Sequence, residues 1–212
     1  MKLKILFQGD SITHAFRKPE EINPAFQLGN GYAFLIAARL AARYPERNFE
    51  FANHAVCGQE VQHVAARLQE DLPALRPDLV SLLVGVSNVL QRAKGVSQMT
   101  SPEILEAYRA LLDDLRKQDP KIKILLLEPF LLKVDTITSR HIDILKPIQT
   151  GLARIADDYA LPLIPLQSTF DAALREAPAE YWAYDGIHPT HAGFQLIADA
   201  WIQHAETFLN LF

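Results

Sequence analysis

The segment LKILFQGDSIT, residues 3–13, begins with an apolar run and ends in a turn that carries polar side chains. The run Leu3–Phe7 is typical of a buried strand, and Gly9 and Asp10 are residues that commonly end one. Ser11 follows at once, where a strand-to-helix turn would present its hydroxyl group at the edge of a sheet. A helix N-cap is the simpler role for such a serine, and the segment alone does not decide between the two.

Similar apolar runs return along the chain, and longer segments with helical spacing lie between them. The further predicted strands are Asn48–Ala52, Leu79–Val84, Ile122–Leu127 and Leu161–Ile164. The predicted helices are Gly31–Tyr44, Val61–Leu75, Pro102–Gln118, Arg140–Tyr159 and His191–Phe208, with Ser101 and Thr190 as N-caps of the third and the last. Such alternation of apolar strands and helices predicts an α/β fold with a parallel sheet covered by helices on both faces.

Length and composition exclude several classes of protein. The chain has 212 residues, 49% of them apolar and 22% charged, with a formal net charge of −4. Without a linker, a repeat or a low-complexity tract, this predicts one domain over residues 1–212. The absence of a Lys/Arg run argues against a nucleic-acid partner. No apolar stretch is long enough for a membrane span or a secretion signal, so we expect a cytoplasmic protein with no membrane partner.

A second polar segment, Asp185-Gly186-Ile187-His188-Pro189, precedes the last predicted helix. A carboxylate three residues before a histidine can accept a hydrogen bond from its Nδ1–H and leave Nε2 free to take a proton from a serine hydroxyl. In open α/β sheets, ligands bind beyond the carboxyl ends of the strands. We therefore expect Ser11 and His188 at the same edge. The simpler alternative is a loop histidine that only hydrogen-bonds to a nearby acid. The occurrence of Gly9-Asp10-Ser11 in the same chain makes this alternative less favoured.

Three segments resemble the sequence blocks of the GDSL, or SGNH, hydrolase family. Residues 7–13 are similar to the family's nucleophile block, with Ser11 at the serine position. Residues 53–58 are similar to its N-x-G-x-x-G block, with Gly58 at the glycine whose backbone N–H serves the oxyanion hole. Residues 185–190 match its last block closely.

The resemblance implies a flavodoxin-like three-layer α/β/α sandwich with a five-stranded parallel sheet, the SGNH hydrolase fold. It implies a catalytic triad of Ser11, Asp185 and His188, and an oxyanion hole that includes the backbone N–H groups of Ser11 and Gly58. The reaction needs no metal and no organic cofactor, and the histidines of the chain are too scattered to predict a metal site.

One block departs from the family pattern. The family has G-x-N-D after its third strand, whereas this chain has Gly85-Val86-Ser87-Asn88. We expect the Asn88 amide to supply the third oxyanion donor, with Ser87 as the alternative. A hole with only two backbone donors remains a further possibility, which would weaken a hydrolase because one oxyanion donor is worth ~10²–10³ in rate.

The segments 28–32, 44–46 and 128–130 look like those of intracellular acetyl-xylooligosaccharide esterases within this family. This implies a serine esterase that removes small acyl groups, above all acetyl, from carbohydrate esters. A homo-oligomer is also expected, and the apolar end Phe208–Phe212 favours it. The alternatives are a thioesterase or lysophospholipase of the same family, and a catalytically weakened carbohydrate-binding module.

Overall fold

The computed structural model describes residues 3–134 and 136–208, which contain a five-stranded sheet in the order β2-β1-β3-β4-β5. All neighbouring strands pair in parallel. The strands are β1 (Leu3–Gly9), β2 (Phe49–Asn53), β3 (Leu79–Leu83), β4 (Lys123–Leu127) and β5 (Leu163–Ile164). This confirms the predicted flavodoxin-like architecture, with the sequence-predicted strands shifted by one or two residues at their ends.

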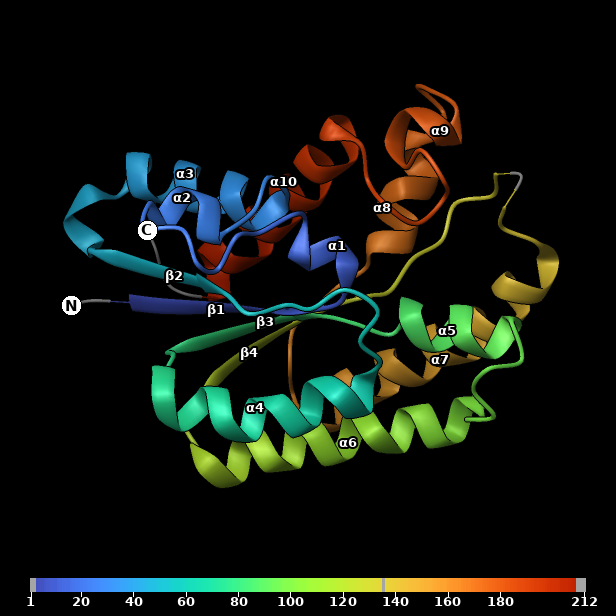
Figure 1. Cartoon of the computed structure of the whole chain (residues 1–212), viewed down its shortest axis with the longest axis horizontal. Helices are drawn as coiled ribbons and strands as arrows, with labels where there is room; N and C mark the ends of the chain where they lie inside the picture. The colour runs from blue at the N-terminus through green and yellow to red at the C-terminus, as the bar shows by residue number, and fades with distance from the viewer. Residues whose placement is uncertain (1–2, 135, 209–212) are drawn as a thin grey trace.

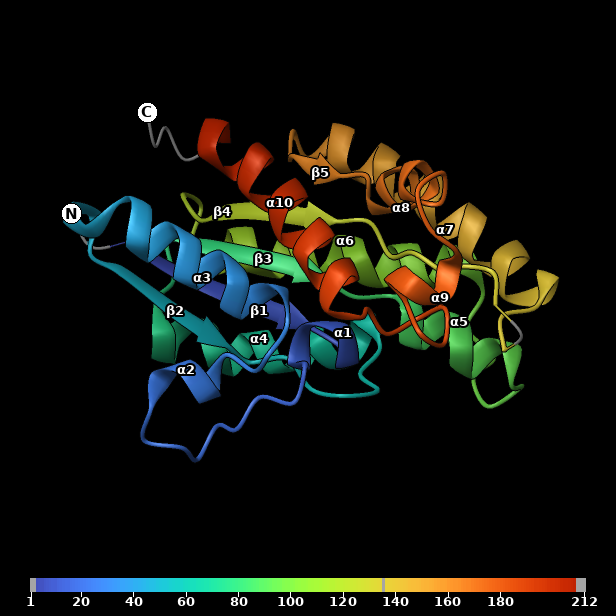
Figure 2. The same cartoon turned by 90° about the horizontal axis from the view of Figure 1, so that it is seen from above.

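Helices cover the sheet on two sides (Figure 1). The long helices are α3 (Tyr32–Arg43), α4 (Val61–Leu75), α6 (Ser101–Gln118), α7 (Ser139–Asp158) and α10 (His191–Phe208). In Figures 1 and 2, α3 and α10 lie on one face of the sheet, and α4, α6 and α7 lie on the other. The β1–β2 connection runs across the sheet in the opposite direction to the later connections between strands. Because such connections are right-handed, this reversal puts α3 on the opposite face from α4, α6 and α7.

Shorter helices that the sequence pattern did not predict fill the connections. They are α1 (Ser11–His14), α2 (Pro24–Gln27), α5 (Val86–Ala93), α8 (Leu166–Ala173), α9 (Ala179–Trp182) and the 3₁₀ turn η1 (Pro45–Arg47). Two of them matter for the site, because α1 follows β1 and α5 follows β3 within three residues, both at the carboxyl edge of the sheet.

The N-cap of α6 is Thr100, and the prediction of Ser101 is wrong by one position. Thr100 Oγ1 accepts the backbone N–H of Glu103, and the Glu103 carboxylate accepts the backbone N–H of Thr100. This reciprocal pair satisfies two backbone donors that a serine cap at position 101 would not. Thr190 is confirmed at the start of α10, where its hydroxyl accepts the N–H of Gly193 at 3.3 Å.

Aromatic side chains between the sheet and the α3/α10 layer pack against β1. The Phe7 ring meets Tyr32 of α3 edge-on and lies 5.9 Å from the Trp201 ring of α10. The Trp201 indole N–H donates to Ser81 Oγ of β3 at 2.9 Å, so this buried polar atom has a partner. These contacts fix the strand that ends at Gly9.

Among the described residues, no helix combines the length and the apolar character that a bilayer crossing requires. Most of the apolar end 208–212, from which we expect subunit contacts, lies outside the described residues.

Candidate active site

The strand order places a switch point at the carboxyl ends of β1 and β3. These strands are neighbours, and the connections that leave them cover opposite faces of the sheet, with α3 following β1 and α6 following β3. Open α/β sheets bind ligands at such switch points. Ser11 begins α1 two residues after β1 ends. Segment 53–58 leaves β2 at the same edge, and Figure 1 shows α1 at the end of the β1 arrow. Ser11 therefore lies at the carboxyl edge of the sheet, where the sequence pattern predicted it.

Three side chains from distant parts of the chain lie in line at this edge. Ser11 Oγ is 2.9 Å from His188 Nε2. His188 Nδ1 is 2.7 Å from Asp185 Oδ2. The other Asp185 oxygen accepts the backbone N–H groups of Ile187 and His188, at 2.9 and 2.7 Å. With Nδ1–H donated to the carboxylate, Nε2 is the acceptor that a serine hydroxyl needs in order to become a nucleophile.

The turn between Asp185 and His188 depends on a glycine. Gly186 has φ +79°, a backbone conformation that side chains with a Cβ rarely adopt. A Cβ at this position would lie 2.3 Å from the carbonyl oxygen of Leu132. The backbone N–H of Leu132 donates to the Gly186 carbonyl at 2.9 Å, which joins this turn to the segment after β4. The glycine therefore lets the turn pack closely enough to hold both polar side chains in place.

Two carboxyl groups of the site have pKa values displaced in opposite directions. Burial alone would raise the pKa of Asp185, but the hydrogen bonds from the His188 ring and from two backbone N–H groups lower it below its usual range. Burial raises the pKa of Asp10 to about 6, against the hydrogen bond from the Ile12 N–H and the charge of His188. Among the described residues, no group hydrogen-bonds to Asp10 Oδ2. Asp185 is thus held as an anion, and Asp10 is a buried acid next to Ser11 that the sequence did not reveal.

Gly58 lies in the exposed part of the segment after β2. Its φ of +76° explains why glycine occupies the position, and an added Cβ would have no atom within 4 Å. The Asn53 side chain anchors the start of the segment: Nδ2 donates to the carbonyls of Thr13 and Leu28, at 2.7 and 2.9 Å, and Oδ1 accepts the N–H of Ala55. One side chain therefore connects the segment of Gly58 to the end of α1.

Ser87 and Asn88 lie in the first turn of α5, and both are buried. The Asn88 amide is already engaged: Nδ2 donates to Glu60 Oε2 at 3.1 Å and to Gln62 Oε1 at 3.3 Å, and Oδ1 accepts the N–H of Val61. These bonds connect α5 to the start of α4, and they leave the Asn88 amide already engaged within the fold.

The aromatic residues near the site divide into core and surface. Phe130 is fully buried and stacks on Phe170 with ring centroids 4.2 Å apart, so it belongs to the core. Tyr184 is 62% exposed, and its ring lies nearly parallel to the His188 ring at 5.9 Å. Tyr184 is therefore the aromatic side chain most directly placed beside the imidazole.

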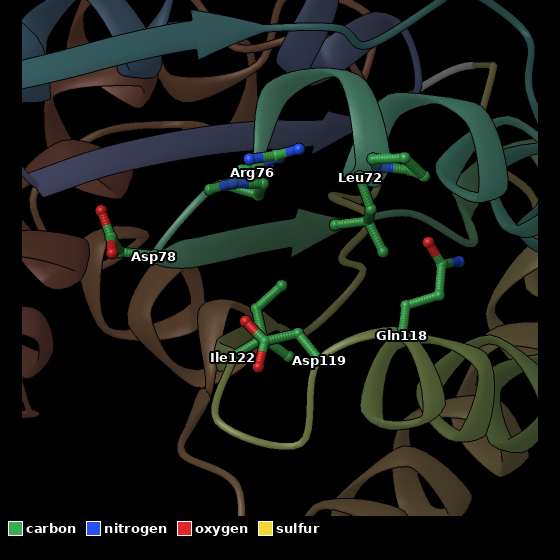
Figure 3. A pocket seen from close by; sticks show the side chains of 8 residues that line it. Leu72, Arg76, Asp78, Gln118, Asp119 and Ile122 are labelled. Carbon is green, nitrogen blue, oxygen red and sulfur yellow. The ribbon is translucent and has the colours of Figure 1, made fainter.

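A cavity of about 560 Å³ lies at the opposite edge of the sheet (Figure 3). Leu72 and Arg76 line it from the end of α4, while Asp78 and Ile122 line it just before β3 and β4 begin. It is therefore separate from Ser11 and His188. Among the described residues, no group of three or more His, Cys, Asp or Glu side chains could hold a metal ion.

Comparisons with known proteins show the family of the chain. The sequence profile of the GDSL-like Lipase/Acylhydrolase family matches residues 7–196. An acetylxylan esterase of Geobacillus stearothermophilus is 30% identical over 207 residues, which are 94% of this chain and 92% of that protein. A GDSL-like lipase structure from Parabacteroides merdae is 31% identical, with a TM-score of 0.91 over 95% of this chain and 94% of that one.

A solved acetylxylan esterase structure from Geobacillus stearothermophilus has a TM-score of 0.84 and 26% identity, over 95% of this chain and 93% of that one. The match of the family profile to most of the chain and the shared fold lead to the same result. This chain belongs to the GDSL-like lipase/acylhydrolase family and is a carboxylic ester hydrolase.

Proposed function

We propose that the chain is a serine esterase that removes small acyl groups, above all acetyl, from carbohydrate esters through an acyl-enzyme intermediate. The observation that carries the proposal is the line of contacts from Ser11 Oγ to His188 Nε2, at 2.9 Å, and from His188 Nδ1 to Asp185, at 2.7 Å. Both distances are within hydrogen-bonding range, and the first is short enough for the Ser11 proton to pass to His188.

In the proposed reaction, His188 takes the Ser11 proton while Oγ forms a bond to the ester carbonyl carbon. The tetrahedral intermediate collapses when the C–O bond to the leaving alcohol breaks and His188 returns the proton to that alcohol. Water, deprotonated by His188, then attacks the acyl carbon on Ser11. The bond from that carbon to Oγ breaks, His188 returns the proton to Oγ, and the acid is released. Asp185 stays ionised throughout and stabilises the imidazolium, which agrees with its lowered pKa.

The proposed oxyanion hole consists of the backbone N–H groups of Ser11 and Gly58 and of one further donor. For that donor we prefer Ser87, because the Asn88 amide already binds Glu60 and Gln62. Replacing Ser87 by Ala should then reduce kcat by about 10²-fold with little change in KM, since a transition-state donor is lost. A matched Asn88→Ala variant distinguishes the two: a larger loss of kcat in Asn88→Ala than in Ser87→Ala would restore Asn88 as the donor.

Two features of the relatives support this chemistry and substrate. The similar esterase is called an acetylxylan esterase, and one structure calls it an acetyl-xylooligosaccharide esterase. Its structures include catalytic mutants in which a serine, an aspartate or a histidine is replaced by alanine, and that aspartate precedes the histidine by three positions, as Asp185 precedes His188. The exposed Tyr184 ring beside His188 offers a flat apolar face of the kind that packs against a pyranose ring.

The test compares acyl chain length and leaving group. Purified protein should hydrolyse p-nitrophenyl acetate faster than the butyrate and octanoate esters, and should release acetate from acetylated xylooligosaccharides. Replacing Ser11 by Ala should lower kcat by at least about 10³-fold. Faster hydrolysis of long acyl esters or of thioesters would support the thioesterase or lysophospholipase alternative. Sugar binding without any turnover dependent on Ser11 would support the binding module.

A further inference from the structure

A cluster of polar side chains lies beside segment 53–58, outside the contacts between Ser11, His188 and Asp185. Its members are Gln8, Arg17, His54, Arg67 and Asp71, which come from β1, the loop after α1, segment 53–58 and α4. The Asp71 side chain is only 15% exposed. A carboxylate so far removed from water requires partners, and no step of the proposed reaction uses it.

Two arginines bind successive carbonyl groups of the segment that carries Gly58. Arg17 Nε donates to the Ala55 carbonyl at 2.8 Å. Arg67 Nη1 donates to the neighbouring carbonyl of His54. Hydrogen bonds from a charged donor are roughly twice as strong as neutral ones. These two bonds therefore restrain the backbone at the residues three and four positions before Gly58.

Asp71 connects this segment to the strand that carries Ser11. One carboxylate oxygen is 3.0 Å from His54 Nδ1, and the other accepts Gln8 Nε2 at 2.5 Å. Gln8 is completely buried, three residues before Ser11, and its Oε1 accepts Arg67 Nη2 at 2.7 Å. Arg67 and Asp71 are one helical turn apart on α4 and thus bind the same Gln8 amide from both ends. The cluster closes a ring of contacts between β1, segment 53–58 and α4.

The charges of the cluster depend on one another. Burial lowers the pKa of both Arg17 and Arg67, and the negative charge of Asp71 opposes this shift in each. The positive charge of Arg17 lowers the pKa of Arg67 further. Burial would raise the pKa of Asp71, but the hydrogen bond and charge of His54 and the charge of Arg67 lower it below its usual range. Asp71 is thus an anion facing two guanidinium groups that repel each other.

We propose that Asp71 is a positioning residue for this esterase. Through Gln8, His54 and Arg67 it holds the Gly58 N–H in register with Ser11, so that this N–H faces the oxyanion formed in the reaction. The proposal rests on the proposed function, because it assigns Asp71 an effect on the transition state that only an acyl-transfer site would show. Asp71 touches neither the substrate nor the reacting atoms.

The test replaces Asp71 by Asn, which keeps the shape of the side chain. The amide has one acceptor oxygen where the carboxylate has two, so one of the two donors, Gln8 Nε2 or His54 Nδ1, then faces an N–H group. The charge that opposes Arg17 and Arg67 is lost as well. Displacing an oxyanion donor costs less than deleting it, so we expect kcat on p-nitrophenyl acetate to fall about 10- to 100-fold while KM stays within about twofold.

A matched control is Glu70→Gln, which makes the same change of charge at the neighbouring, exposed position of α4. It should leave kcat and KM unchanged. Asp71→Glu restores a carboxylate and should recover part of kcat. Arg67→Lys keeps the positive charge but cannot bind His54 and Gln8 together, so it should also lower kcat, and its effect should not add to that of Asp71→Asn. These further variants keep the proposal testable if Asp71→Asn does not fold.

An alkylboronic acid provides a readout that loss of stability alone would not change. Boron forms a bond to Ser11 Oγ, the serine proton passes to His188, and the resulting tetrahedral anion places an oxygen where the oxyanion forms. Its inhibition constant should rise in Asp71→Asn by the same factor by which kcat falls, and should not change in Glu70→Gln.

Three results would overturn the proposal. One is wild-type kcat in a folded Asp71→Asn or Arg67→Lys variant, and another is a loss confined to KM. The third is a fall in kcat with unchanged boronic acid affinity. Each of these leaves the proposed function standing as long as turnover disappears in Ser11→Ala. If wild-type protein shows no hydrolysis that depends on Ser11, the proposed function and this inference fail together.

Discussion

Asp10 precedes Ser11 and Asp185 contacts His188, yet their surroundings displace the two pKa values in opposite directions. Asp185 receives hydrogen bonds from the His188 ring and two backbone N–H groups, which stabilise its ionised form. Asp10 is 1% exposed, and one of its oxygens has no partner among the described residues. The site therefore keeps one carboxylate at a gain in stability and the other at a cost.

The cost at Asp10 can be measured. The pKa of Asp10 rises from 3.8 to about 6 on folding. Between these pH values the folded state keeps a proton that the unfolded state loses. The free energy of unfolding therefore falls as pH rises through this window. Asp10→Asn should therefore stabilise the protein by about 1–3 kcal/mol at pH 8, with a smaller gain at pH 5. Urea unfolding at both pH values checks this, and an equal or larger gain at pH 5 would contradict it.

At the scale of elements, the long helices and the strands follow from the sequence, whereas the short helices do not. The apolar spacing of Val61–Leu75 and His191–Phe208 predicted α4 and α10 with their observed limits. Single-turn helices such as α1 form few internal hydrogen bonds, so tertiary contacts determine them and no periodic pattern marks them.

The α6 cap gives a prediction at this scale. Thr100→Ala removes the side-chain acceptor for the Glu103 N–H and should lower stability by about 1 kcal/mol without changing kcat, because α6 contributes no residue to the proposed site. Glu103→Gln keeps an acceptor oxygen for the Thr100 N–H, so its loss should be smaller. Thermal unfolding of both variants measures the difference. Unchanged stability of Thr100→Ala would mean that the reciprocal cap does not stabilise α6.

The site itself was predictable only in part. Ser11, Asp185 and His188 were identified from two short motifs because each motif is local in sequence, and the structure brings them within contact distance. The engagement of Asn88 by Glu60 and Gln62 was not visible, because it depends on how α5 packs against α4. Asp71 carries no motif, and its proposed role depends on partners up to 63 positions away.

For the whole molecule, we expect a homo-oligomer. The connection between α1 and α3 exposes Phe16 at 81%, Ile22 at 96% and Phe26 at 53% of their surface. Several large apolar side chains in one exposed segment are typical of a surface that another chain covers. Light scattering coupled to size exclusion should give a multiple of 23.8 kDa, and replacement of Phe16 and Ile22 by Ser should lower that mass. A wild-type mass equal to one chain would contradict the expectation.

The reaction at Ser11 is the central claim, and covalent labelling tests it most directly. A fluorophosphonate loses fluoride when a nucleophilic serine attacks its phosphorus, so peptide mapping by mass spectrometry identifies the residue that carries the label. The account predicts a single labelled residue, Ser11, and a labelling rate that falls by about 10³-fold or more in His188→Ala. Labelling at another residue, or equally fast labelling of Ser11 without the His188 imidazole, would contradict it.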